Sequence, residues 1–177
     1  VANDGLVNLT RWVSLSAIKA LPAAEALRSE FPWAPTESLS LVPHPRVLVA
    51  GCGTGQHLLK VAGRFLGAQV TGVDLSRSSL AYAARKAMEL GFEDVSVVQA
   101  DILALGAWSD PFHIIECAGV LHHMEDPMAG WSVLTHLLAP GGFMKVGLYS
   151  EAARQPVVEA RAFIAEQGWA ATADDIR

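Results

Sequence analysis

Two hydrophobic patterns alternate along residues 47–168. Short, nearly continuous apolar runs are separated by longer stretches in which apolar residues recur every three or four positions. Continuous apolar runs are typical of strands buried on both faces, and the longer spacing is typical of amphipathic helices. The alternation predicts a doubly wound α/β fold with a parallel sheet. Expected strands cover 47–51, 69–74, 95–99, 112–117 and 142–149, and expected helices cover 55–66, 77–90, 128–139 and 151–167.

Glycine and proline mark the expected ends of these helices. Gly91 follows the second helix, Pro140-Gly141-Gly142 follows the third, and Gly168 follows the fourth. Glycine favours the left-handed conformation that commonly ends a helix, and proline cannot continue one. These residues therefore support the predicted element boundaries.

The first 45 residues follow a different pattern. Asp4 is expected to cap a helix with an apolar face, and Pro22 is expected to begin a second helix that ends before Phe31-Pro32. Further prolines predict an extended connector into the first strand. The sequence therefore predicts an N-terminal helical segment with a proline-rich connector at 1–45 and a cofactor-binding domain at 46–177. The apolar positions of the first helix are Leu6, Leu9, Trp12, Val13, Ala17 and Ala20, and the connector prolines are Pro32, Pro35, Pro43 and Pro45.

A glycine-rich turn follows the first expected strand. The segment VLVAGCGTG at 47–55 ends in three alternating glycines, and the next strand ends at Asp74. Glycines allow backbone N–H groups at a helix N-terminus to approach a ligand closely. A carboxylate at the end of the second strand has the geometry to accept hydrogen bonds from two ribose hydroxyls, although it could also cap the helix that begins near Ser76. The pair of features predicts a nucleoside-bearing cofactor.

The spacing of the glycines narrows the choice of cofactor. Gln56 stands where the dinucleotide fingerprint G-x-G-x-x-G has its third glycine, which disfavours a dinucleotide enzyme. No Lys-Ser or Lys-Thr pair follows the glycines, so a phosphate-binding P-loop is excluded.

The motif G-x-G-x-G with an acid at the end of the next strand resembles the class I S-adenosylmethionine-dependent methyltransferases. VTGVDLS, VQADIL, FHIIECAGVLHHMEDP and LLAPGGFMKVGLYS follow in the order and spacing of that family. DLSRSSLAYAARK and GVLHHMEDP are similar to methyltransferase domains joined to tetratricopeptide repeats in bacterial proteins. The resemblance implies a Rossmann-like sheet with strand order 3-2-1-4-5. It also implies S-adenosyl-L-methionine as the cofactor and S-adenosyl-L-homocysteine as its product.

The resemblance also implies which residues bind the cofactor. The glycine turn would border the methionyl part, and Asp74 with Leu75 would lie at the ribose. Asp101 would face the adenine amino group, although it could equally cap the turn DILALG. The segment from Glu116 to Gly119 would border the methyl group. The implied contacts are Gly51, Cys52, Gly53, Gly55, Asp74, Leu75, Asp101, Ile102 and Cys117.

His122 and His123 are the candidates for acid–base chemistry. They lie after the fourth strand, and no Cys or carboxylate stands at a spacing that would complete a closed zinc site, so we expect no metal. One imidazole bonded to the backbone would be a structural role. The alternative is a general base at His122, because an unperturbed imidazole titrates near neutrality.

Composition limits the possible partners and location. The chain has 177 residues, 51% of them hydrophobic, and a net charge of −5 with scattered Lys and Arg, which disfavours nucleic acid. No apolar run approaches the roughly 20 residues needed to span a bilayer, and the N-terminus shows no signal-peptide pattern. We therefore expect a cytoplasmic protein without a membrane partner, whose two cysteines remain reduced thiols.

The ends of the sequence suggest a piece of a longer protein. The chain starts at Val1 and stops at Arg177, just after a pattern that resembles a capped helix start. The resembling family has seven strands, of which the last two are not expected here. The strand at 142–149 would then be an edge covered by the N-terminal segment, a partner chain or the parent protein.

The expected activity is methyl transfer to an oxygen, nitrogen or carbon nucleophile of a small molecule. Two alternatives remain open at this point. One is a non-catalytic module that binds S-adenosylmethionine or S-adenosylhomocysteine within a larger protein, and the other is a protein methyltransferase.

Overall fold

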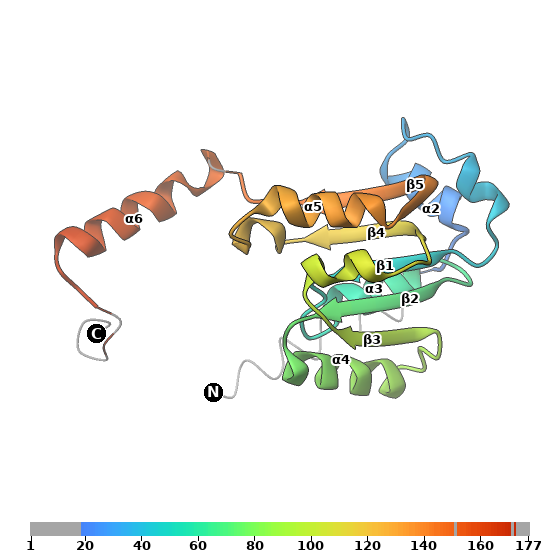
Figure 1. The fold of residues 1–177 in the computed structure, drawn as a ribbon, viewed down its shortest axis with the longest axis horizontal. Coiled ribbons are helices and arrows are strands. Elements are labelled where there is room, and N and C mark those ends of the chain that lie inside the picture. Colours follow the sequence, from blue (N-terminus) through green and yellow to red (C-terminus); the bar gives the residue numbers. More distant parts are fainter. Residues whose placement is uncertain (1–18, 151, 171, 173–177) are drawn as a thin grey trace. The chain divides into compact units, whose positions relative to one another are not determined.

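The computed structural model describes residues 19–150, 152–170 and 172. Within them, five strands form one parallel sheet in the order β3-β2-β1-β4-β5 (Figure 1). The predicted class, sheet and strand order are confirmed. The strands are β1 (Arg46–Ala50), β2 (Gln69–Asp74), β3 (Val95–Gln99), β4 (Phe112–Ala118) and β5 (Leu138–Gly147).

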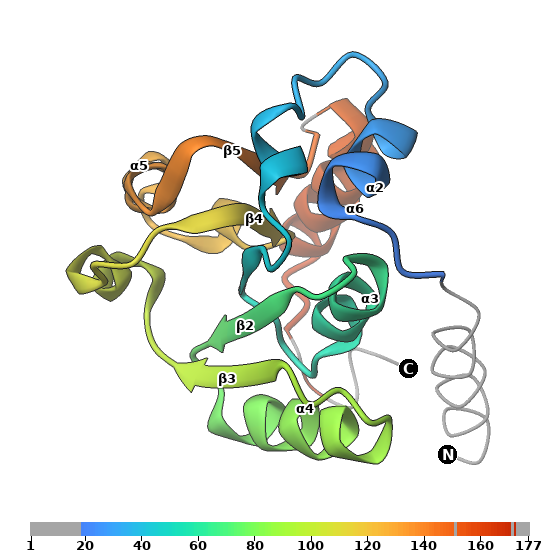
Figure 2. The same cartoon turned by 90° about the vertical axis from the view of Figure 1, so that its right-hand side faces the viewer.

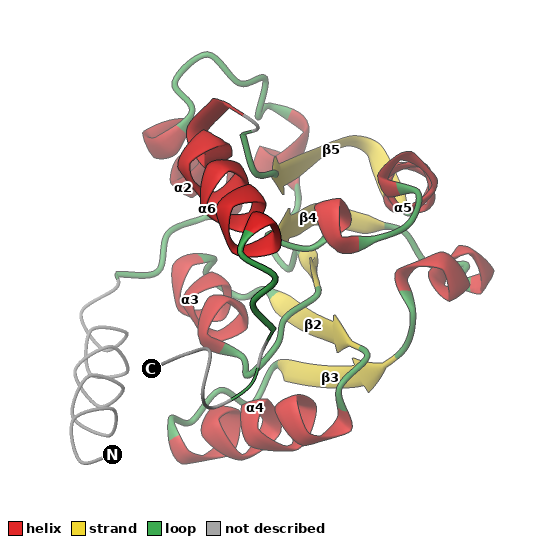
Figure 3. Ribbon diagram, turned by 90° about the vertical axis from the view of Figure 1, so that its left-hand side faces the viewer, coloured by secondary structure: helices red, strands yellow, loops and turns green. Residues whose placement is uncertain are grey.

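Helices cover both faces of this sheet (Figures 2 and 3). One face carries α2 (Ala23–Glu30), α3 (Gln56–Arg64) and α4 (Arg77–Glu89), and the other carries α5 (Pro127–His136) and the 3-10 helix η3 (Ile102–Ala107). Alternate residues of each strand supply the two cores. In β1, Val47 and Val49 pack into one apolar cluster, whereas Leu48 and Ala50 pack into the other. Burial of both faces explains why the strands read as continuous apolar runs.

Local capping residues fix where these helices begin. Ser76 Oγ accepts a hydrogen bond from the backbone N–H of Ser79 at the start of α4. Asp126 Oδ1 accepts from the N–H groups of Met128 and Ala129 at the start of α5, and Pro127 occupies the first helical position. A side-chain oxygen at this position satisfies N–H groups that have no partner within the helix. The two caps therefore set the first residues of α4 and α5.

The boundary between α5 and β5 differs from the prediction. α5 ends at His136 and β5 begins at Leu138, whereas the sequence pattern predicts a helix to 139 and a strand over 142–149. Leu138 pairs with Phe112, and the register then shifts before Ile114 pairs with Phe143. Gly141, at φ +72°, lies within this irregularity. The Pro-Gly-Gly segment therefore interrupts a strand instead of following a helix, because glycine also suits the bulge of a strand.

The N-terminal region is described from Lys19 onward. Its helix α2 begins after Pro22 and ends at Glu30, as predicted, while the helix expected around Leu6 to Ala17 lies outside the described residues. Ser38, in the 3-10 helix η2 (Ser38–Leu41), donates its hydroxyl to the backbone carbonyl of Gly141 in β5. The N-terminal region thus reaches the outer strand of the sheet. The domain division at residue 45 stays a prediction, and so does the full covering of the β5 edge.

The chain divides into two compact units, Val1–Gly147 and Leu148–Arg177. The second unit holds the 3-10 helix η5 (Ala152–Arg154) and helix α6 (Gln155–Glu166), where a helix is predicted. Within it, the rings of Phe163 and Trp169 meet edge to face at 5.6 Å. No helix formed by the described residues combines the length and apolar content of a membrane-spanning segment.

Candidate functional site

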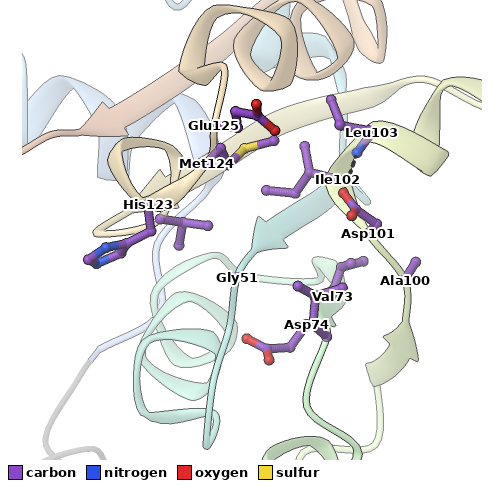
Figure 4. A pocket seen from close by; sticks show the side chains of 12 residues that line it. Gly51, Val73, Asp74, Ala100, Asp101, Ile102, Leu103, His123, Met124 and Glu125 are labelled. Carbon is purple, nitrogen blue, oxygen red and sulfur yellow. Dashed lines mark hydrogen bonds between the residues drawn. The ribbon is translucent and has the colours of Figure 1, made fainter.

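A cavity of ≈ 370 Å³ lies at the carboxyl ends of the first three strands and the loop after β4 (Figure 4). The strand order reverses between β1 and β4, and ligands of doubly wound sheets bind at such a position. Five of the predicted site residues line the cavity: Gly51, Asp74, Leu75, Asp101 and Ile102. The other lining residues are Val73, Ala100, Leu103, Val120, His123, Met124 and Glu125.

Asp74 joins two segments of the cavity wall. Its Oδ2 accepts a hydrogen bond of 2.8 Å from the N–H of Gly53, and its Oδ1 accepts one of 2.9 Å from the N–H of Ser76. The carboxylate therefore fixes the glycine turn and the chain that enters α4. A carboxylate has about four acceptor positions, so Asp74 keeps capacity for hydroxyl donors such as those of a ribose.

The three glycines of the turn have two different structural reasons. A Cβ on Gly51, at φ +73°, would lie 2.2 Å from Val120 Cγ2, and a Cβ on Gly55, at φ +88°, would lie 2.6 Å from Ala83 Cβ in α4. Around Gly53 there is no atom within 4 Å of the Cβ position. Two glycines thus allow close packing of the turn, while the middle one leaves open space beside exposed backbone. This open cradle fits a ligand that approaches the turn.

The adenine side of the predicted site combines a cap with apolar surface. Asp101 Oδ1 accepts a 2.9 Å hydrogen bond from the N–H of Leu103 and so caps η3, which is the structural alternative for this residue (Figure 4). Asp101 nevertheless lines the cavity. Leu75 and Leu103 are exposed there, and Ile102 is buried beside them. Exposed apolar side chains around a cavity suit a planar, largely apolar group such as adenine.

The two cysteines lie behind the cavity surface. Both Cys52 and Cys117 are buried and free, and neither side chain lines the cavity. Burial raises the pKa of each thiol to about 11, with a further contribution from the charge of Asp74 at Cys52. The thiols therefore stay protonated at neutral pH. The predicted cofactor contacts of these residues would have to come from their backbone groups.

The histidine pair lies in the loop after β4, in the 3-10 helix η4 (Leu121–His123). The Nε2 atoms of His122 and His123 are 3.1 Å apart, so one imidazole donates a hydrogen bond to the other. His123 lines the cavity, whereas His122 does not (Figure 4). The direction of adjacent side chains in a short 3-10 turn depends on how the turn packs, so the sequence pattern could not distinguish them.

Val120, Met124 and Glu125 were not predicted as site residues. They line the cavity from the loop that connects β4 to α5, with Met124 and Glu125 on the side opposite Val73 and Asp74 (Figure 4). Two signals in the sequence point to them: they belong to the motif GVLHHMEDP, and they follow a strand that adjoins the reversal of strand order.

A buried carboxylate lies next to the site in β4. Glu116 is 1% exposed, its Oε2 lies 2.9 Å from Nε2 of His57, and its Oε1 lies 3.4 Å from Nη1 of Arg64. Burial raises the pKa of a carboxyl group, but here His57, Arg64 and Lys145 together hold the pKa of Glu116 below its ordinary value. Glu116 is therefore ionised at neutral pH.

Comparison with known proteins agrees with this geometry. A family model described as "Methyltransferase domain" matches residues 47–142, which is more than half of the chain, so the chain belongs to this family. A "Ubiquinone biosynthesis O-methyltransferase" of Paracidovorax citrulli is 36% identical over 100 residues, which cover 56% of this chain and 41% of that protein. The cofactor of the family is S-adenosylmethionine, as the sequence predicts.

Two solved structures support the fold. PKMT2 of Rickettsia typhi, determined in complex with S-adenosylhomocysteine, is 27% identical with a TM-score of 0.58 over 67% of this chain and 24% of that one. The [4+2]-cyclase SpnF is 32% identical with a TM-score of 0.55 over 60% of this chain and 39% of that one. The chain spans between 29% and 43% of the length of the first curated relatives that it matches.

Proposed function

We propose that this chain transfers the methyl group of S-adenosylmethionine to an oxygen, nitrogen or carbon nucleophile of a small molecule. The observation that carries the proposal is the carboxylate of Asp74, which holds the glycine turn at the wall of a cavity where the strand order reverses. An acidic acceptor, an open backbone turn and an exposed apolar wall together suit the ribose, methionyl and adenine parts of this cofactor.

The sulfonium of the cofactor supplies an activated methyl group, so the protein mainly aligns the acceptor. Alignment of two reacting groups at roughly 3 Å accounts for a large part of the rate in such reactions. A base is needed only when the acceptor arrives protonated. His122 is our proposed base, and its Nε2 lies 3.1 Å from Nε2 of His123, which lines the cavity.

The relatives support a small-molecule acceptor. The curated O-methyltransferases that match this chain act, by their names, in ubiquinone biosynthesis. A protein acceptor is the alternative in this class.

A second candidate function is favoured by one particular relative. SpnF, which is 32% identical to this chain over the matched region, is named as a [4+2]-cyclase and not as a methyltransferase. Membership of the fold thus does not by itself imply methyl transfer. The second candidate is a module that binds S-adenosylmethionine or S-adenosylhomocysteine without transferring the methyl group.

Binding and turnover measured separately distinguish these functions. Titration calorimetry should show that the chain binds S-adenosylhomocysteine. The parent protein, incubated with methyl-labelled S-adenosylmethionine and a fractionated metabolite extract, should transfer label to a small molecule. Label in protein would favour a protein acceptor, and binding without transfer to any acceptor would favour the binding module. Absence of binding would refute both candidate functions.

A further inference from the structure

Glu116 is the one charged residue among the described residues that is fully buried. It lies in β4 between Val49 of β1 and Lys145 of β5, in a strand whose neighbours Ile115 and Cys117 are apolar and buried. A buried carboxylate loses its hydration, and well-packed apolar side chains often replace a buried ion pair without loss of stability. Its presence in an inner strand of a parallel sheet therefore calls for a reason other than packing.

The partners of Glu116 connect it to the helix that follows the glycine turn. His57 and Arg64 both belong to α3, on the same side of the helix two turns apart, and both approach the Glu116 carboxylate. Arg64 Nη1 also lies 2.9 Å from Oε2 of Glu30 in α2, and Glu30 pairs with Lys145. The network thus connects the helix after the turn to two neighbouring strands and to α2.

His57 is the member of the network that lies in the first turn of α3. It is the second residue of α3, whose N-cap is Gly55, and its side chain is 40% exposed while its partner Glu116 is buried. Nε2 of His57 lies 2.9 Å from Oε2 of Glu116, a contact that becomes an ion pair when the imidazole is protonated. This short contact links the first turn of α3 directly to β4.

We propose that Glu116 is a positioning residue for the methionyl part of the cofactor. Through His57 it holds the first turn of α3, and with it the glycine turn, against the end of β4. We assign the adenosine part to Asp74, Asp101 and the apolar wall, and the hydrogen bonds of the two carboxylates go to backbone N–H groups and not to the Glu116 network. This inference rests on the proposed cofactor-binding function, and it predicts that the two halves of the cofactor depend differently on Glu116.

The test compares two ligands on matched variants. S-adenosylhomocysteine carries the amino-acid portion, whereas adenosine lacks it. For Glu116→Gln we expect the affinity for S-adenosylhomocysteine to fall by about five- to tenfold, which is a typical size for coupling between two sites. The affinity for adenosine should change by less than about twofold. His57→Gln should give the same pattern, and the double variant should bind no more weakly than Glu116→Gln alone.

Glu30→Gln is the matched control, because it removes the outer carboxylate of the network without touching Glu116 or His57. It should leave the ratio of the two affinities unchanged. If Glu116→Gln does not fold, His57→Gln decides the question, because His57 is partly exposed and its substitution leaves the core intact.

The outcomes separate this inference from the proposed function. If the wild-type chain binds neither ligand, the proposed function fails. If the wild type binds both, and His57→Gln leaves the ratio of affinities unchanged or lowers both affinities equally, the inference is overturned and the cofactor site stands. A selective loss for S-adenosylhomocysteine in His57→Gln supports it.

Discussion

At the scale of single residues, the site depends on one carboxylate with several partners. Asp74 accepts hydrogen bonds from two backbone N–H groups and also lines the cavity. The sequence left two interpretations of this residue, a ribose acceptor and a helix cap. In the structure Ser76 caps α4 with its own hydroxyl, and Asp74 binds the backbone of Ser76 and Gly53. The carboxylate therefore preorganises the turn that a ligand would contact.

Replacement of Asp74 by Asn should weaken the binding of S-adenosylhomocysteine at least about tenfold, because hydrogen bonds to a charged group contribute about 1.5–3 kcal/mol. The amide keeps the size of the side chain but removes the charge and one acceptor oxygen. Titration calorimetry measures the change. Asp110→Asn is the control, since Asp110 is an exposed carboxylate that pairs with Arg46 at the start of β1. Equal affinity for wild type and Asp74→Asn would contradict the ribose assignment.

The histidine pair allows a second test at this scale. His122→Ala should lower the rate of methyl transfer more than it lowers cofactor affinity, with a loss on the order of a hundredfold for a positioned base. His123→Ala should reduce both the rate and the affinity, because His123 lines the cavity. Steady-state kinetics of the parent protein with its acceptor measure both quantities. Full activity of a His122→Ala protein that melts at a lower temperature would assign His122 a structural role instead.

At the scale of elements, contact of the glycine turn with α4 positions the start of α3. Gly55 is the N-cap of α3 in the left-handed conformation, and Ala83 of α4 occupies the space next to it. The motif predicts a glycine here for ligand access, but the contact with Ala83 is a packing requirement. It places the start of α3 against the middle of α4.

Gly55→Ala should therefore destabilise the fold more than Gly53→Ala does. Both variants place a side chain at positive φ, which costs on the order of 1 kcal/mol, but only at position 55 does the new Cβ collide with another residue. Overpacking of this kind typically costs a further 1–3 kcal/mol or so. Urea unfolding of the two variants gives the comparison. Equal losses of stability would show that α4 moves aside without penalty.

The elements also show which parts of the structure the sequence could predict. Continuous apolar runs and helix caps determine β1 to β4 and the helices beside them, because both signals are local. The start of β5 could not be predicted, since the pairing of Leu138 with Phe112 and the following shift of register depend on a distant strand. The contact between Glu116 and His57 joins residues far apart in the sequence, so it left no periodic signal. The histidine that lines the cavity was likewise determined by the packing of a short turn.

At the scale of the whole molecule, the charge network joins four elements of the first unit. Glu116 of β4 meets His57 and Arg64 of α3, and Arg64 meets Glu30 of α2, which pairs with Lys145 of β5. These contacts connect the N-terminal region to the middle of the sheet. Removal of one charge from the network should therefore lower the stability of the whole unit and not only weaken one contact.

The network should give the protein a specific sensitivity to acid. The pKa of Glu116 in the folded state lies below its ordinary value of 4.5. Burial alone would raise this pKa, but His57, Arg64 and Lys145 lower it by more. A depressed carboxyl pKa contributes stability that is present above pH 4.5 and is lost as the pH falls through the folded-state pKa. Protonation then leaves His57, Arg64 and Lys145 without the charge that they face.

Glu116→Gln should therefore flatten the acid side of the stability profile. Relative to its own stability at pH 7, the variant should lose less free energy of unfolding between pH 5 and pH 3 than the wild type, as measured by urea unfolding at each pH. At pH 7 the variant should be less stable, because Arg64 keeps a partly buried charge with one partner fewer. Glu89→Gln is the control. The pKa of Glu89 is also lowered, by its hydrogen bond with Lys86. Because this pair is exposed, its contribution to the free energy of unfolding should be small and should vanish in high salt. Parallel profiles for wild type and Glu116→Gln would show that the Glu116 carboxyl is protonated together with the ordinary surface carboxyls and that the network does not hold its charge.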